Sequence, residues 1–314
     1  MQTDRTSTFN RDRLVTRAPA VFKWLFISLV VGVGLSLGLY FYAVLSFDTD
    51  TFPENHGKVN ARLFVGSGTN LPLIVGLGGA EGGNAWASSY WETQRNDFIS
   101  QGYALLAVGY FGMEGTPREL DRIALDGVFQ AIVNASQHSN INQRCIAVIG
   151  ASKGAELGLL LASTYPEIKA VVAMVPGNAV FPALTIAMNT PSFSLNNEPL
   201  EFVPVPWSAI PALLRGDLRA AWVEMLKDTE AVARSEISIE KINGPIYFVS
   251  ATQDEFWPSK EMSESMELRL KDREFQHVVE HLVVEGDHAS VLNHFDDVER
   301  FLDRNFLQES TVGC

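Results

Sequence analysis

The sequence predicts an α/β fold, a mostly parallel β-sheet with helices on both faces, preceded by one transmembrane helix. Two features predict it: an uncharged apolar run near the N-terminus, and short β-rich runs that alternate with helical segments along the rest of the chain. The 314 residues are 46% hydrophobic and 19% charged, which suits a large core. A formal net charge of −13 argues against a nucleic-acid partner, whose phosphates need a basic surface. Two cysteines are too few for a disulfide framework or a zinc site.

The apolar run occupies residues 24–47, WLFISLVVGVGLSLGLYFYAVLSF, and contains no charged side chain. About 20 apolar residues are enough for a helix to cross about 30 Å of hydrocarbon. Trp24 at one end and the aromatic group 40–42 at the other suit the two headgroup interfaces. A cleaved signal peptide is the competing interpretation, but its apolar region is normally about 7–15 residues and ends at a small-residue site. We therefore expect residues 24–47 to be an uncleaved anchor in the lipid bilayer.

The flanks of this run predict its orientation. Residues 1–24 carry five basic and two acidic side chains, a net charge of +3, which leaves −16 for the remainder. The positive-inside rule then places the tail 1–23 in the cytoplasm and residues 48–314 on the non-cytoplasmic side, the periplasm in a bacterium. Gly34 and Gly38 have the GxxxG spacing that pairs membrane helices, so a weak homodimer is a further expectation.

Residues 48–314 are expected to form one domain around the sheet. Lys58–Val65 alternates like an edge strand, and the later runs are apolar throughout, as in buried parallel strands. The expected inner strands are 73–75, 103–108, 145–149, 170–175, 246–250 and 281–284. Helices are expected over about 118–136, beginning near Thr116-Pro117, and over Lys153–Ser163.

Residues 177–244 interrupt this alternation. They contain six prolines, the apolar and aromatic stretch Phe202–Trp207 and a helical run near 208–235. An apolar insertion between core strands is typical of a cap over a binding cleft. Ordinary packing of a peripheral subdomain is the alternative.

The segment Gly150-Ala151-Ser152-Lys153-Gly154 lies between an expected strand and an expected helix. This arrangement is a nucleophile elbow, in which glycines flank the serine because a larger side chain would collide with the strand or the helix. The turn presents the Ser152 hydroxyl at a helix N-terminus, where the dipole favours developing negative charge. The motif therefore predicts the α/β-hydrolase fold with Ser152 as nucleophile.

The partners of such a serine follow in the order acid, then histidine. Asp254 comes directly after the strand 246–250, and His288 follows the last strand in EGDH. In this position Asp254 can orient the imidazole, while His288 acts as general base and then as general acid. Asp254 could alternatively cap the turn before the helix that begins near residue 259, and Glu255 is a competing acid.

The glycine-rich segment GLGGAEGG, residues 76–83, follows a strand and lacks the Lys-Ser/Thr ending of a phosphate loop. It suits an oxyanion loop, in which a backbone N–H of Gly79 or Ala80 acts together with that of Lys153. A plain turn is the alternative.

A second motif, His277-Val278-Val279-Glu280-His281, matches the H-x-x-E-H zinc pattern. That motif binds metal only on a helix, whereas the valines here favour a strand. We expect no metal site and no organic cofactor.

The sequence resembles the C-terminal α/β-hydrolase domain of the bile acid-CoA:amino acid N-acyltransferase and acyl-CoA thioesterase family. The resemblance is carried by GLGGAEGG, GYALLAVGYFG (102–112), IGASKGAELGLLLAS (149–163), ISIEKINGPIYFVSATQDEFWPS (237–259) and EGDH. It implies a triad of Ser152, Asp254 and His288, and hydrolysis of fatty acyl-CoA or transfer of the acyl group to an amine. The family's acyltransferases use a cysteine nucleophile, so the serine here favours hydrolysis.

The expected function is a membrane-anchored serine hydrolase that cleaves acyl thioesters. Because acyl-CoA is cytoplasmic and the charge flanks export the catalytic domain, an exported carboxylesterase or lipase acting on other acyl esters is the alternative. An acyltransferase and a non-catalytic binding module are the remaining alternatives.

Overall fold

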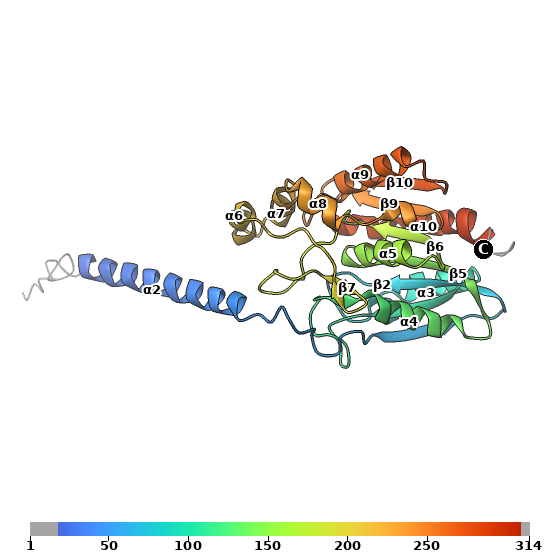
Figure 1. Ribbon diagram of the computed structural model, residues 1–314, viewed down its shortest axis with the longest axis horizontal. Helices are drawn as coiled ribbons and strands as arrows, with labels where there is room; N and C mark the ends of the chain where they lie inside the picture. The colour runs from blue at the N-terminus through green and yellow to red at the C-terminus, as the bar shows by residue number, and fades with distance from the viewer. Residues whose placement is uncertain (1–17, 309–314) are drawn as a thin grey trace, which may run out of the picture. The chain divides into compact units, whose positions relative to one another are not determined.

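The structure is a computed structural model that describes residues 18–308 (Figure 1). The chain divides into two compact units, Met1–Asp48 and Thr49–Cys314. In the first unit, helix α2 spans Ala18–Leu45, and its segment Val21–Leu45 is long and apolar enough to cross a membrane or to act as a signal sequence. The helix thus ends two residues before the expected limit of the span. Residues 1–17 of the expected tail lie outside the described residues.

The second unit is built around a seven-stranded sheet in the order β1-β3-β2-β5-β6-β9-β10. The edge strand β1 is antiparallel to β3, and the other neighbours are parallel. The strands are β1 Asn60–Val65, β2 Leu71–Leu77, β3 Ala104–Gly109, β5 Ile141–Ala151, β6 Ile168–Met174, β9 Ile246–Ala251 and β10 Val279–Val284. All seven expected strands are therefore present, with β1 at the edge as predicted.

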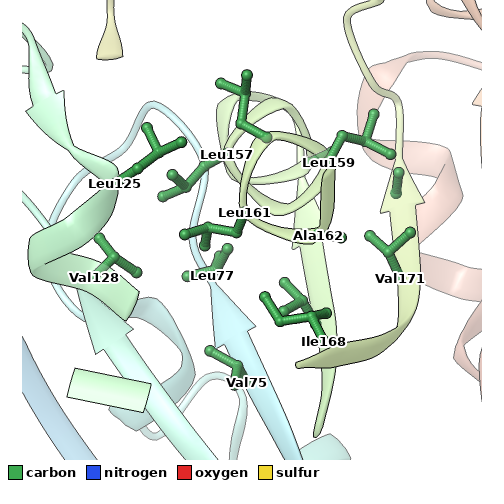
Figure 2. Close-up of a cluster of buried hydrophobic side chains, with 14 of the residues drawn as sticks. Val75, Leu77, Leu125, Val128, Leu157, Leu159, Leu161, Ala162, Ile168 and Val171 are labelled. Carbon is green, nitrogen blue, oxygen red and sulfur yellow. The ribbon is translucent and has the colours of Figure 1, made fainter. Parts of the chain in front are cut away.

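Helices cover both faces of this sheet. One face packs against α4 Leu125–Ser136, α5 Lys153–Thr164 and α9 Ser259–Asp272, and the other against α3 Glu92–Ser100 and α10 Phe295–Leu302. Figure 2 shows the first of these interfaces, where Leu157 and Leu161 of α5 lie over Val75 and Leu77 of β2. Each inner strand buries both of its faces, which explains the continuous apolar runs in the sequence.

The helix expected over about 118–136 begins at Leu125 rather than near Thr116, so this expectation was wrong at its N-terminal end. Arg122 has a positive φ of 46°, which a helix does not allow, and its guanidinium forms a buried ion pair with Asp121. The next residues form the short strand β4, Ile123–Ala124, which pairs with β7. The pairing of β4 with β7 is a tertiary contact that local periodicity does not reveal, and it takes the place of the first turns of the expected helix.

The insertion at 177–244 packs around a small core that includes Phe181, Val203 and Trp222, and it shares this core with Trp257 and Met262 from outside the insertion. Its elements are β7 Phe193–Leu195, β8 Glu198–Pro199, the 3₁₀ turn Trp207–Ala209, α6 Ile210–Leu214, α7 Leu218–Met225, α8 Thr229–Ser235 and the 3₁₀ turn Ile239–Lys241. Figure 1 shows α6, α7 and α8 gathered at the end of the sheet towards which the parallel strands point. The insertion therefore lies where ligands bind in parallel α/β sheets.

Candidate active site

Ser152 lies at the sharp turn between β5 and α5, with φ 56° and ψ −123°. Its N–H donates to the Met174 carbonyl at 2.8 Å, which ties the turn to β6. A Cβ at Gly150 would come 2.1 Å from the Gly154 oxygen, and one at Gly154 would come 2.3 Å from the Gly78 oxygen. Only glycine fits at either position, so the flanking glycines of the motif have the steric role expected of an elbow.

Asp254 and His288 are hydrogen-bonded to each other. The Nδ1 atom of His288 lies 2.8 Å from Oδ1 of Asp254, whose side chain is fully buried. The same oxygen accepts the backbone N–H groups of Phe256 at 3.0 Å and Trp257 at 3.3 Å, so Asp254 also caps its turn. The competing acid, Glu255, accepts the backbone N–H of His288 at 2.9 Å and has no bond to the ring.

His288 is also held by the start of its own helical turn. Asp287 forms a capping box with Ser290, in which Oδ1 accepts both the backbone N–H and the hydroxyl of Ser290. This hydroxyl contact holds the pKa of Asp287 below its ordinary value of 3.8. The ring of Phe256 lies edge-on to the imidazole at 4.8 Å between centroids. Capping and ring packing together fix the loop that carries the histidine.

Ser152 and His288 line one cavity of about 800 Å³. Its walls are mostly apolar and include seven aromatic side chains, Trp86, Tyr90, Trp91, Trp222, Phe256, Trp257 and Phe295. The insertion contributes Leu184, Leu218 and Trp222 to these walls. Among the described residues 18–308, the Ser152 hydroxyl has no hydrogen bond to His288. In many enzymes the hydrogen bond between a catalytic serine and its histidine is long without substrate and shortens when substrate binds.

The glycine-rich loop stands beside the nucleophile. A Cβ at Gly79 would come 3.3 Å from the Ser152 Cβ, so the loop backbone approaches the serine closely. The Gly79 N–H donates to Oε1 of Glu81 at 3.0 Å. From the other side, the Tyr110 hydroxyl donates to the Gly78 carbonyl at 2.6 Å, and burial raises the pKa of Tyr110 well above its ordinary value. The loop is therefore held at two points next to the serine.

The other two expected oxyanion donors also line the cavity. Ala80 is exposed on the loop, and Lys153 is the first residue of α5. At that position a helix leaves its N–H groups without intrahelical acceptors, and the helix dipole favours negative charge.

The Lys153 side chain has a structural partner that the sequence analysis did not foresee. Its ammonium lies 2.9 Å from Oε2 of Glu156 and 2.9 Å from the Ser192 hydroxyl, and both charged side chains are almost completely buried. Oε1 of Glu156 accepts the Phe181 N–H at 3.1 Å. Burial lowers the pKa of Lys153 and raises the pKa of Glu156, while their mutual attraction opposes both shifts. The sequence feature that could have predicted this ion pair is the presence of two opposite charges three residues apart on an otherwise apolar helix.

A second serine–histidine–carboxylate chain lies away from the cavity. His281 Nε2 is 2.7 Å from the Ser250 hydroxyl, and its Nδ1 is 2.7 Å from Oε2 of Glu267. Ser250 is fully buried and does not line the cavity. His281 lies on strand β10, as the valines predicted, and the described residues hold no group of three or more potential metal ligands.

The parallel sheet, the elbow after β5 and the cavity at the carboxyl ends of the strands define an α/β hydrolase. The family described as BAAT / Acyl-CoA thioester hydrolase C terminal matches residues 129–289, a range that includes Ser152, Asp254 and His288. The chain belongs to this family.

The relatives include both hydrolases and acyltransferases. The chain is 29% identical over 207 residues to the mouse acyl-coenzyme A amino acid N-acyltransferase 1, a match that covers 65% of this chain and 45% of that protein. It is 28% identical over 209 residues to the mouse peroxisomal succinyl-coenzyme A thioesterase, covering 66% and 46%. The matches thus span about half the length of these curated relatives.

Solved structures show the same fold at low sequence identity. A Pyrococcus horikoshii acylaminoacyl peptidase superposes with a TM-score of 0.57 at 14% identity, covering 79% of this chain and 40% of the peptidase. A puromycin-hydrolyzing peptidase from Mycobacterium tuberculosis superposes with a TM-score of 0.56 at 15% identity, covering 79% and 37%. At this identity the likeness concerns the fold alone.

Proposed function

We propose that the protein is a serine hydrolase that cleaves acyl thioesters through Ser152, His288 and Asp254. The observation that carries the proposal is the hydrogen bond between Asp254 and the ring of His288, in a cavity that the elbow serine also lines. The serine at the elbow, where the acyltransferases of the family have cysteine, favours transfer of the acyl group to water. The aromatic and aliphatic walls of the cavity suit an acyl chain.

The proposed reaction has two halves. Ser152 Oγ attacks the acyl carbonyl and His288 takes its proton, while the bond to Asp254 stabilises the imidazolium that forms. The developing oxyanion is held by the backbone N–H of Lys153 and by one from the glycine-rich loop. The expected donors on that loop were Gly79 and Ala80, and Ala80 is the better candidate because the Gly79 N–H already donates to Glu81. His288 then protonates the leaving thiol, and water releases the acid from the acyl-enzyme in the same sequence of steps.

A second candidate is a carboxylesterase acting on acyl esters that lack CoA. One observation favours it: the lysine that lines the cavity, Lys153, is buried against Glu156, and no arginine is among the lining residues. Nucleotide phosphates generally pair with lysine or arginine. The test is a comparison of palmitoyl-CoA with the p-nitrophenyl ester of the same acid, using the purified full chain and its Ser152→Ala variant. Turnover that is abolished in Ser152→Ala supports a serine hydrolase. A preference for palmitoyl-CoA supports the thioesterase, and a preference for the p-nitrophenyl ester supports the carboxylesterase.

The apolar helix α2 is proposed to anchor the enzyme in a bilayer, with the catalytic unit on the non-cytoplasmic side. The basic residues before the helix and the acidic residues after it support this orientation. A C-terminal alkaline phosphatase fusion tests it, because that enzyme is active only after export. An inactive fusion in a well-expressed protein would contradict the proposed orientation.

A further inference from the structure

Glu81 brings a negative charge to the site beside the nucleophile. It lines the same cavity as Ser152, and its Oε1 accepts the Gly79 N–H at 3.0 Å. Its other oxygen would lie 2.8 Å from a Cβ at Gly79, and the same Cβ would lie 3.3 Å from the Ser152 Cβ. Glu81 is an exposed residue, so its carboxylate is held on the loop next to the serine and at the same time faces solvent.

The cavity offers little positive charge to balance this carboxylate. Among its lining residues, all of which the structure describes, the other side chains that can carry a positive charge are Lys153 and His288. The Lys153 side chain is 2% exposed, and its ammonium is already paired with Glu156. Glu255 adds a second carboxylate close by, since it accepts the backbone N–H of His288. With Lys153 counted together with Glu156, the side-chain charges beside the site are therefore negative in sum.

The aromatic walls of the cavity also favour a cation over an anion. Seven aromatic side chains line the cavity, and aromatic faces attract cations through their negative quadrupole. Carboxylates combined with aromatic rings favour an ammonium group over a neutral one, and they repel an anion.

We propose that Glu81 is a specificity-determining residue that selects substrates by the charge next to the scissile bond. Cationic leaving groups are preferred to neutral ones, and neutral to anionic. The inference rests on the proposed serine hydrolase, because it assumes that Ser152 is the attacking group. Substitution by glutamine is a close probe, since its side-chain oxygen can still accept the Gly79 N–H while the charge is removed.

The experiment uses three phosphonothioate probes that share one alkylphosphonyl group and differ in their leaving thiol. The thiols are thiocholine, N-acetylcysteamine and 3-mercaptopropionate, which are cationic, neutral and anionic. In each case Ser152 Oγ forms a bond to phosphorus, the P–S bond breaks, the thiolate leaves and His288 takes the serine proton. Rates of labelling by the full chain are measured for the wild type, Glu81→Gln and Glu285→Gln. Glu285 is exposed and does not line the cavity, so its variant removes the same charge elsewhere.

We expect the wild type and Glu285→Gln to react at least about tenfold faster with the cationic probe than with the anionic one, given the strength of a charge pair at short range near a protein surface. In Glu81→Gln this ratio should fall to within about threefold of unity, by the same argument. Labelling with an unchanged ratio in Glu81→Gln would overturn the role of Glu81 and leave the serine hydrolase standing. Absence of labelling by all three probes in the wild type would instead overturn the proposed nucleophile, and the inference with it.

Discussion

The ammonium of Lys153 lies 2.9 Å from the carboxylate of Glu156, and this ion pair connects the helix that follows the nucleophile to the insertion 177–244. Lys153 reaches the Ser192 hydroxyl, and Glu156 accepts the N–H of Phe181. Both hydrogen-bond partners belong to the insertion, so two buried charges join the elbow to the insertion. A buried pair of this kind costs much when one partner is lost, because the other charge remains without compensation.

The first prediction concerns this pair. Lys153→Met should lower the free energy of unfolding by about 3–5 kcal/mol, because Glu156 is left buried without its cation. The double variant Lys153→Met/Glu156→Leu should recover most of that loss. Urea unfolding monitored by tryptophan fluorescence measures both effects. If the double variant lost as much free energy of unfolding as the two single variants lose in sum, the two charges would not be coupled.

The second prediction tests the orienting role of Asp254. Asp254→Asn should lower kcat by about 10⁴-fold, since an amide cannot hold the His288 ring in the tautomer that accepts the serine proton. Glu255→Gln is the matched control, because Glu255 contacts only the backbone N–H of His288. Steady-state turnover of the preferred acyl substrate gives the comparison. If Glu255→Gln proved as damaging as Asp254→Asn, the assignment of the acid would be wrong.

Much of this site could be predicted from the sequence, because an elbow and an ordered acid and histidine depend on local motifs at strand ends. The structure brings the three expected side chains to one region, although the sequence left Glu255 open as the acid. What could not be predicted depends on long-range packing. The Lys153–Glu156 pair gains its hydrogen-bond partners from the insertion, and the Ser250–His281–Glu267 chain joins β9, β10 and α9.

The third prediction concerns pH. The pKa of Asp287 is lowered in the folded protein, chiefly by the Ser290 hydroxyl, so its contribution to stability is present above about pH 4 and is lost as the pH falls through the folded-state pKa. At pH 7 the Asp287→Asn variant should therefore melt at a lower temperature than the wild type. The gap should narrow as the pH falls below 3.8, the ordinary value for this group. A constant gap in melting temperature across this range would contradict the shifted pKa.

The fourth prediction uses two glycines one turn apart on α5. A Cβ at Gly154 would meet the Gly78 backbone oxygen at 2.3 Å, whereas one at Gly158 would meet a valine methyl group at 3.1 Å. Gly154→Ala should destabilise the protein by about 1–3 kcal/mol and displace the loop beside Ser152, so that turnover is lost. Gly158→Ala should keep most of its activity, because a side-chain methyl group can shift. Equal activity in the two variants would exclude a steric role for the elbow glycine.

The central claim is that Ser152 is the nucleophile, and the second serine–histidine–carboxylate chain provides the sharpest control. The Ser250 hydroxyl lies 2.7 Å from Nε2 of His281, but Ser250 is fully buried and does not line the cavity. The most direct measurement is covalent labelling of the full chain by a fluorophosphonate probe, compared between the wild type, Ser152→Ala and Ser250→Ala. We predict that Ser152→Ala abolishes labelling while Ser250→Ala retains it. Undiminished labelling of Ser152→Ala would contradict the account.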